Sequence, residues 1–308
     1  MPAPAKIVDS HQHVRWHQRD EHGLVADMDA HGISYAWLLS WQLSHADQAP
    51  EYNFCYNPAH FAPDGSHPGI PLSDLLDTKR QYPDRFVVGF CPHPLWAQAP
   101  AILEAACNMH GIRVCGEWKF RVAFDDPRSI AIFQKAGELK LPVVLHLDVP
   151  HLPDPQTGKP VFQPLWYGGR VDALERALQA CPDTIFIGHA PGFWREISGD
   201  ADQDTKQYPD GPVTSGGKLY RLFDAYPNLY ADLSAGSGRT ALARDPEHAL
   251  KFVTRYADRL LFGRDYYEQD LHKFLQTLPL SQEITDKIYW QNAERLVASP
   301  KQVVGRDR

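Results

Sequence analysis

Short apolar runs recur along the chain, and segments with the spacing of amphipathic helices separate them. The runs are rich in Val, Ile, Leu and Phe, which is typical of buried strands. Alternating strands and helices imply parallel β-α-β units, and eight such units make a closed (β/α)8 barrel. The pattern therefore predicts an α/β protein, a single-domain TIM barrel over residues 5–300 with a C-terminal tail at 301–308. The eight predicted strands are 6–13, 34–40, 86–91, 112–120, 143–148, 184–189, 229–234 and 260–265.

The connections at the two ends of this barrel differ in length. The helix-to-strand connections are short and share one layout in QYPDRFVVGF, ACPDTIFIGH and AYPNLYADLS: a helix end, Pro, Asp or Asn, then a strand. Proline cannot continue a helix, and Asp or Asn supports the turn that follows. The strand-to-helix connections at 44–72, 149–169 and 191–215 are much longer. Because such loops build the active sites of barrels, we expect function at the carboxyl ends of the strands.

Side chains that can bind a metal ion stand at these carboxyl ends. His11 and His13 are two residues apart on a strand and so point to the same face. Alone, this pair is weak evidence for a metal site and is more often two hydrogen-bonded core histidines. A barrel interior prefers Val, Ile and Leu, however, and a cluster of imidazoles and carboxylates without a cation would be costly to bury. We therefore predict a metal site that activates water. Its candidate ligands are His11, His13, Glu117, His146, His189 and Asp265.

The order of these residues resembles the amidohydrolase superfamily of metal-dependent hydrolases: HxH on the first strand, His on the fifth and sixth, and Asp on the eighth. The opening VDSHQH resembles the amidohydrolase-2 branch, which contains lactonases and decarboxylases, and is similar to the opening of its sugar-lactone hydrolases. The resemblance runs from Ile7 to about Ala298. It implies that His11 and His13 bind a metal ion near the barrel floor.

The same resemblance implies further roles. Asp265 would join the metal ligands and take the proton from bound water. His146 and His189 would bind a second ion, or one would complete the first site while the other polarises the substrate. Asp9, which precedes the HxH pair, would accept a hydrogen bond from a ligating histidine, since such histidines need a partner on the other ring nitrogen.

The number of metal ions depends on GEWKF, which offers Glu117 and Lys119 on one face. Two-metal members of the superfamily place a bridging carboxylate on the fourth strand, either a carboxylated Lys or a Glu. Glu117 resembles the GE motif of TatD-like hydrolases, which favours it as the bridge. The alternative is an ion pair of Glu117 with Lys119 or an Arg in a one-metal site. The imidazole-rich set favours zinc, as one or two ions per chain.

Several residues could contact a substrate. In SAGSGRTALARD, Arg239 and Arg244 could clamp a carboxylate, or else cap and charge the helix that follows. Trp194 and Lys119 are further candidates for substrate binding. Arg264 directly precedes Asp265, and strand alternation points it away from the interior, so we expect a buried salt bridge there.

Composition excludes other classes of protein. A net charge of -7 argues against a general nucleic-acid or anionic-membrane binder, because these need basic faces. No run of apolar residues is long enough to span a bilayer, and the opening residues lack the features of a secretory signal. The five cysteines are scattered without a CxxC pair, which is typical of buried free thiols. These features predict a cytoplasmic protein with a small-molecule substrate, no nucleic-acid or membrane partner, and loop aromatics that would suit a homo-oligomer.

We therefore expect a metal-dependent hydrolase acting on a lactone, amide or ester of a small organic acid. The alternatives are a non-oxidative decarboxylase on the same scaffold, a metal-free lactonase, and a barrel that binds without catalysing. Specificity in this fold lies in the long loops, and no motif in them names a substrate.

Overall fold

Eight parallel strands form the centre of the computed structural model, which describes residues 1–298. Hydrogen bonds join them into two runs, β1-β2-β5 and β6-β7-β10-β11-β12. The bridge between Gly89 and Val114 connects β5 to β6, and Ser10 N donates to Phe262 O at 3.0 Å where β12 meets β1. The sheet is therefore closed, which confirms the predicted TIM barrel. The strands are β1 (Val8–Gln12), β2 (Tyr35–Leu38), β5 (Phe86–Val88), β6 (Cys115–Trp118), β7 (Val143–His146), β10 (Phe186–His189), β11 (Leu229–Asp232) and β12 (Leu260–Leu261).

Each of the eight predicted strands contains an observed one, but the observed strands are shorter. The difference is largest at β12, which was expected to reach Asp265 and ends at Leu261. Asp265 has a φ of 64°, so the backbone has left the extended conformation before that residue. Apolar runs thus predicted the strands correctly, whereas some of the polar residues at their ends, such as His13 and Asp265, lie in the turns that follow. The predicted tail at 301–308 lies outside the described residues.

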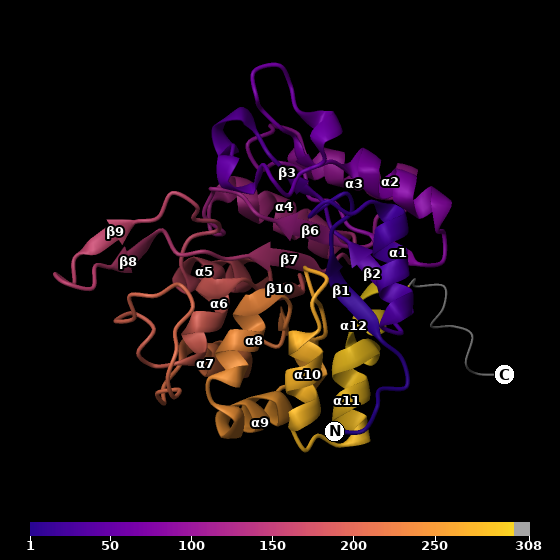
Figure 1. The fold of residues 1–308 in the computed structure, drawn as a ribbon. Helices are drawn as coiled ribbons and strands as arrows, with labels where there is room; N and C mark the ends of the chain where they lie inside the picture. Colours follow the sequence, from indigo (N-terminus) through magenta and orange to yellow (C-terminus); the bar gives the residue numbers. More distant parts are fainter. Residues whose placement is uncertain (299–308) are drawn as a thin grey trace.

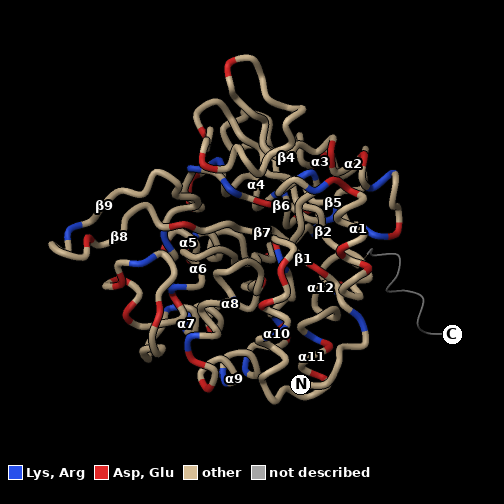
Figure 2. The backbone as a smooth tube through the Cα atoms, viewed as in Figure 1, with Lys and Arg blue, Asp and Glu red and all other residues tan. Residues whose placement is uncertain are grey.

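Helices surround the barrel (Figure 1) and bury their apolar faces against it. In α4, for example, Ile132, Phe133 and Ala136 are buried at helical spacing, and the Asp126 side chain caps the first turn by accepting from Arg128 N. Figure 2 shows acidic and basic residues interspersed over the outer helices and loops. The helices are α1 (Glu21–Ala30), α2 (Leu72–Gln81), α3 (Ala99–His110), α4 (Pro127–Glu138), α5 (Val171–Ala180), α7 (Lys218–Ala225), α8 (Ala235–Ala243), α9 (Pro246–Arg255), α10 (Asp270–Thr277), α11 (Gln282–Asp286) and α12 (Asn292–Val297).

The long strand-to-helix connections carry additional short elements, as their length predicted. The connection after β2 holds the antiparallel pair β3 (Trp41–Gln42) and β4 (Gly69–Ile70). After β7, the hairpin of β8 (His151–Pro153) and β9 (Pro160–Phe162) projects from the barrel (Figure 1). After β10 come α6 (Pro191–Trp194) and a short 3-10 helix, η4 (Arg195–Ile197). These connections all lie at the carboxyl ends of the strands, where the candidate ligands stand.

A buried ion cluster fastens the last strand to the first. Arg264 is 2% exposed, and its Nε donates to Asp9 Oδ2 at 2.8 Å. Its Nη2 lies 2.7 Å from Asp27 Oδ2 on α1, and Asp9 Oδ1 also accepts from the Arg264 backbone N at 2.9 Å. The salt bridge predicted for Arg264 is therefore confirmed, and it joins β1, α1 and the end of β12.

All five cysteines are free, and four of them are buried, which agrees with the prediction of buried free thiols. None of the helices in residues 1–298 has both the length and the apolar character needed to cross a membrane.

Candidate active site

Three imidazoles and two carboxylates converge at the carboxyl end of the barrel. His11 lies in β1 and His13 directly follows it, His189 closes β10, Glu117 lies in β6 and Asp265 follows β12. The Nε2 atom of His13 lies 3.4 Å from Asp265 Oδ1 and 3.5 Å from Glu117 Oε2. The Nε2 atoms of His11 and His189 each lie 3.9 Å from Glu117 Oε1. The two histidines of the HxH pair thus share a face, as their spacing predicted.

This arrangement fits a divalent metal ion. The Nε2 atom of His11 is buried and has no hydrogen-bond partner among the described residues, which is costly unless another group binds there. Two sets of ligand atoms lie within 4.8 Å of one another: His11 with Glu117 and His189, and His11 with His13 and Asp265. Both sets contain His11, so they lie next to each other at the barrel mouth. Imidazole and carboxylate ligands suit zinc and other first-row divalent metals.

The other ring nitrogen of each histidine is held by an acceptor. Asp232, at the end of β11, accepts from His11 Nδ1 at 2.8 Å and from His189 Nδ1 at 3.0 Å. His13 Nδ1 donates to Leu39 O at 2.8 Å. A proton on Nδ1 leaves the Nε2 lone pair free, so these contacts aim all three Nε2 atoms at the common centre.

Asp232 takes the role that the sequence analysis gave to Asp9, and that expectation was wrong. Asp9 is occupied by Arg264 and by Gln12 Nε2, which donates to it at 2.9 Å. Asp232 was missed, although the sequence contains a signal for it. It closes the apolar run LYAD in the same way that Asp265 follows its own run. Partners of a histidine ring cannot be assigned from spacing, since they come from a different strand.

The electrostatics of the site favour a bound cation. Burial lowers the pKa of His11, but the nearby carboxylates of Asp232, Asp265 and Glu117 raise it to about 10. Burial raises the pKa of Glu117, yet His146 and Lys119 hold it well below its usual range. Glu117 therefore stays ionised, and the His11 ring beside it carries an additional proton. A metal ion would replace that proton, so we expect its binding to release protons and to weaken as the pH falls.

His146 lies beside this centre with both ring nitrogens engaged. Its Nδ1 lies 2.5 Å from Glu117 Oε1, and its Nε2 lies 2.9 Å from Asp148 Oδ2. It is therefore not part of either set of ligand atoms, whereas His189 is. The second ion that the resemblance assigned to His146 and His189 stays a prediction. His189 lies with His11 and Glu117 in one of the two sets of ligand atoms.

The backbone takes left-handed conformations where three of the site strands end. Asp265, Ala190 and Ala235 have φ values of 64°, 78° and 58°. Such values are uncommon in residues other than glycine and cluster at functional sites. They turn the chain sharply after β10, β11 and β12, and they place Asp265 over the barrel mouth, where its backbone N donates to His11 O at 2.8 Å.

A cavity of about 260 Å³ opens above the centre. His13, His146, His189 and Asp265 form its base, and its walls include Trp16, Trp41, Tyr52, Tyr208 and Tyr266. Lys119 is 6% exposed and also lines the cavity. Its Nζ lies 4.1 Å from the ring centre of Trp41, 4.9 Å from that of Tyr52 and 5.3 Å from that of Tyr167. The cavity therefore combines an ammonium group, aromatic faces and the candidate metal centre.

Of the four residues predicted to bind substrate, only Lys119 lines this cavity. Arg244 caps the end of α8, where its guanidinium donates to Gly211 O at 2.6 Å. Arg239 lies on α8, half-buried and outside the cavity. Trp194 is buried under the barrel mouth and donates from Nε1 to Asp232 O at 3.0 Å. The structure thus corrects the placement of these three residues, because helical spacing turned the arginines and Trp194 away from the cavity.

Replacing Asp232 by Asn should weaken metal binding by about 10- to 100-fold, as loss of a partner behind a ligating histidine typically does. The amide can accept from only one of the two histidines, so one Nε2 loses its fixed direction. Titration of the metal-free protein with zinc measures this, with Asp224→Asn as the control, since Asp224 forms an exposed ion pair with Arg255. Equal affinity in the two variants would remove Asp232 from the site.

Comparison with known proteins gives one family. A family model described as amidohydrolase matches residues 8–298. No curated protein sequence matches the chain. Among solved structures, an uncharacterised TIM-barrel protein from Bordetella bronchiseptica is similar, with 18% identity, a TM-score of 0.63, and coverage of 95% of this chain and 98% of its own.

Two further solved structures are similar at the level of the fold. A protein from Acinetobacter baumannii, described as a probable 2-pyrone-4,6-dicarboxylic acid hydrolase with citric acid bound, has 15% identity, a TM-score of 0.56, and coverage of 96% of this chain and 100% of its own. A dihydroxybenzoic acid decarboxylase from Polaromonas, with bound manganese and the inhibitor 2-nitroresorcinol, has 18% identity, a TM-score of 0.54, and coverage of 95% and 96%.

Proposed function

Because the chain belongs to the amidohydrolase family, we propose that it is a metal-dependent hydrolase of a small carbonyl compound that carries a carboxylate. A lactone, an ester or an amide of an organic acid fits this description. The observation that supports the proposal is the convergence of three imidazole Nε2 atoms and two carboxylates at the base of a cavity that also contains Lys119. The small cavity and its buried ammonium group together suit a small anionic substrate.

His11, His13, His189, Glu117 and Asp265 would hold the metal ion. When bound, such an ion acts as a Lewis acid and lowers the pKa of a water molecule. Imidazole ligands favour zinc, and the Polaromonas decarboxylase contains manganese, so both ions are candidates here.

The chain's own residues would handle the substrate and the proton. Asp265 lines the cavity, and its carboxylate would accept a proton from the attacking water and return it to the leaving group. Lys119 would bind the substrate carboxylate. The aromatic walls around Lys119 would exclude water and strengthen that contact.

Metal analysis and isotope labelling test the proposal. Protein purified without chelators should carry about one equivalent of zinc or manganese, because the two sets of candidate ligand atoms share His11. Chelation should abolish activity on a panel of carboxylated lactones, esters and amides, and either metal should restore it. In ¹⁸O-water the product carboxylate should contain one labelled oxygen. Failure of the protein to bind metal on reconstitution would contradict this mechanism and favour a metal-free lactonase.

Non-oxidative decarboxylation is a second candidate, supported by His146. This imidazole lies at the cavity wall between the carboxylates of Glu117 and Asp148, where it could deliver a proton to carbon. Two observables separate the reactions: a decarboxylase releases carbon dioxide and leaves one solvent deuterium bound to carbon in D2O, whereas a hydrolase does neither. Carbon dioxide release from a carboxylated aromatic substrate would replace the hydrolase proposal.

Replacing Lys119 by Met should raise KM for a carboxylated substrate by about 10- to 100-fold, since a charge-assisted hydrogen bond is lost. Methionine fills the same aromatic surroundings, so we expect the fold and the metal content to persist. Turnover of the corresponding neutral substrate should change little. Lys135→Met is the matched control, because Lys135 lies on α4 and pairs with Glu138. An equal loss on charged and neutral substrates would show that Lys119 does not read the carboxylate.

A further inference from the structure

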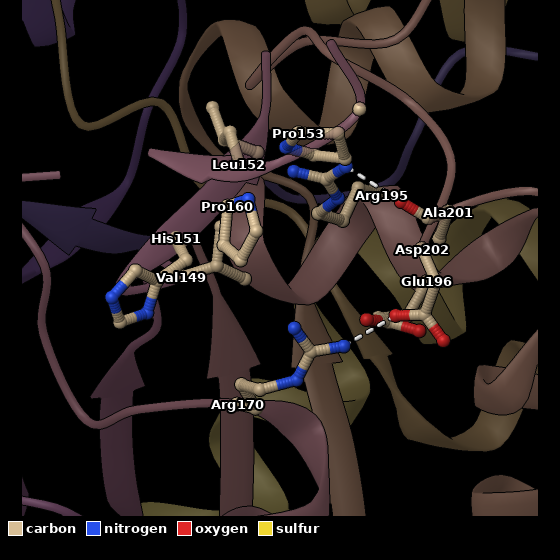
Figure 3. Close-up of a pocket in the computed structure, with 11 residues that line it drawn as sticks. Val149, His151, Leu152, Pro153, Pro160, Arg170, Arg195, Glu196, Ala201 and Asp202 are labelled. Carbon is tan, nitrogen blue, oxygen red and sulfur yellow. Dashed lines mark hydrogen bonds and ion pairs between the residues drawn. The ribbon is translucent and has the colours of Figure 1, made fainter. Parts of the chain in front are cut away.

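A second cavity of about 280 Å³ lies outside the active site (Figure 3). It opens between the β8–β9 hairpin and the segment that follows β10. One wall is apolar and consists mainly of Leu152, Pro153 and Pro160, and the opposite wall carries Arg170, Arg195 and Asp202. It shares no lining residue with the active-site cavity. It is therefore a separate site, although both of its walls belong to segments that leave the active-site strands β7 and β10.

Arg195 is the unusual residue of this cavity. It is 3% exposed, so its guanidinium is almost fully buried. Its Nη2 donates to the backbone carbonyls of Ala201 at 2.6 Å and Asp204 at 2.8 Å, whereas its Nη1 has no hydrogen-bond partner within residues 1–298. Figure 3 shows this guanidinium between Pro153 and Ala201 at the edge of the cavity.

The two acidic residues that line the cavity, Glu196 and Asp202, are already paired with other cations. Asp202 accepts from Arg170 and, at 3.0 Å, from Lys218 Nζ. Glu196, which also lines the cavity, lies 3.3 Å from Lys218 Nζ. Arg195 itself forms no ion pair within the described part of the chain. Buried charges are normally paired, because an isolated one loses its hydration without compensation.

We propose that this cavity binds a small organic monocarboxylate other than the substrate. Its carboxylate would accept from Arg195 Nη1, and its apolar body would lie against Leu152, Pro153 and Pro160. A single negative charge is favoured over a phosphate dianion, because Glu196 and Asp202 stand on the same wall and would repel the additional charge. The volume is sufficient for a molecule of the size of benzoate.

Methyl NMR on protein labelled at Leu and Val can locate the binding. Val149 and Leu152 line the second cavity, whereas Leu165 lines the active-site cavity, so each cavity carries its own reporter. Titration with benzoate should shift the Val149 and Leu152 methyl resonances. Benzamide, which is neutral, and inorganic phosphate should shift them much less at the same concentration. Equal shifts with benzamide, or shifts confined to Leu165, would overturn the proposal.

Three variants test which residues bind the probe. Arg195→Met should weaken benzoate binding at Val149 and Leu152 by about tenfold or more, because a charge-assisted hydrogen bond is lost. Arg195 also holds two backbone carbonyls, so Leu152→Trp provides an independent test that fills the cavity without touching the guanidinium. Lys119→Met, in the other cavity, should leave these shifts unchanged. Undiminished Val149 methyl shifts with benzoate, in a folded Arg195→Met or Leu152→Trp protein, would contradict the proposed site.

Discussion

Replacement of His11 by alanine is expected to abolish metal binding and to lower kcat/KM by about 10³-fold or more. His11 is the residue common to both sets of ligand atoms, so its loss removes a ligand from every arrangement the site offers. Its Nε2 is also the buried nitrogen without a partner, which a bound ion would satisfy. Metal content after gel filtration and steady-state kinetics with added zinc or manganese measure the two effects.

Two controls separate the loss of a ligand from a loss of fold. His110→Ala changes an exposed histidine in the last turn of α3 and should retain metal and activity. The melting temperature of the His11→Ala protein should be compared with that of metal-free wild type, because the variant also leaves Asp232 with one histidine partner instead of two. A His11→Ala protein that keeps a full equivalent of tightly bound metal would show that the centre lies elsewhere.

Replacement of Arg264 by methionine should lower the free energy of unfolding by about 3–5 kcal/mol, the usual cost of removing one partner from a buried ion pair. Asp9 would remain buried without its cation, and Asp27 would keep only Arg19 as an arginine partner. Urea unfolding of the metal-free protein measures the loss at neutral pH. Arg255→Met is the matched control, since Arg255 forms an exposed pair and should cost at most about 1 kcal/mol.

The loss caused by Arg264→Met should depend on pH. Burial already raises the pKa of Asp9 above its usual value, and Arg264 opposes that rise. Without the arginine the pKa should rise further, so the folded variant binds more protons than the unfolded chain at mildly acidic pH. Stability of the variant relative to wild type should therefore improve as the pH falls and Asp9 becomes protonated. If the difference in unfolding free energy between the variant and wild type stays constant from neutral to acidic pH, lost packing is its cause.

The sequence alone predicted the barrel because its signals are local. Apolar runs of strand length, helical spacing between them and Pro-Asp or Pro-Asn turns each depend on neighbours along the chain, and together they allow few topologies. The functional end of the barrel could be predicted for the same reason, because the lengths of the loops can be counted directly in the sequence. The eight predicted strands are all present, and all of their ends except that of β10 were placed too late, because polar residues after a run resemble its continuation.

The candidate site was predictable only in part. His11 and His13, two apart on one strand, were correctly expected to share a face, and Arg264 was correctly expected in a buried salt bridge. The histidine partner Asp232 was missed and Asp9 was given its role, because hydrogen bonds to a ring nitrogen cross from one strand to another. Composition and loop position suggested that three residues bind substrate: Arg239, Arg244 and Trp194. The turns after the strands direct these side chains away from the cavity.

The sequence by itself determined the barrel, its functional end and the set of side chains at that end. It could do so because the spacing of apolar residues along neighbouring positions already indicates which segments are buried strands and helices. Tertiary structure decided the rest: that both sets of ligand atoms share His11, that Asp232 aims two histidines, and that Lys119 lies within an aromatic cage. It also decided that Arg195 is buried without an ionic partner in the described chain. These outcomes depend on angstrom-scale distances between strands far apart in sequence, and packing alone sets such distances.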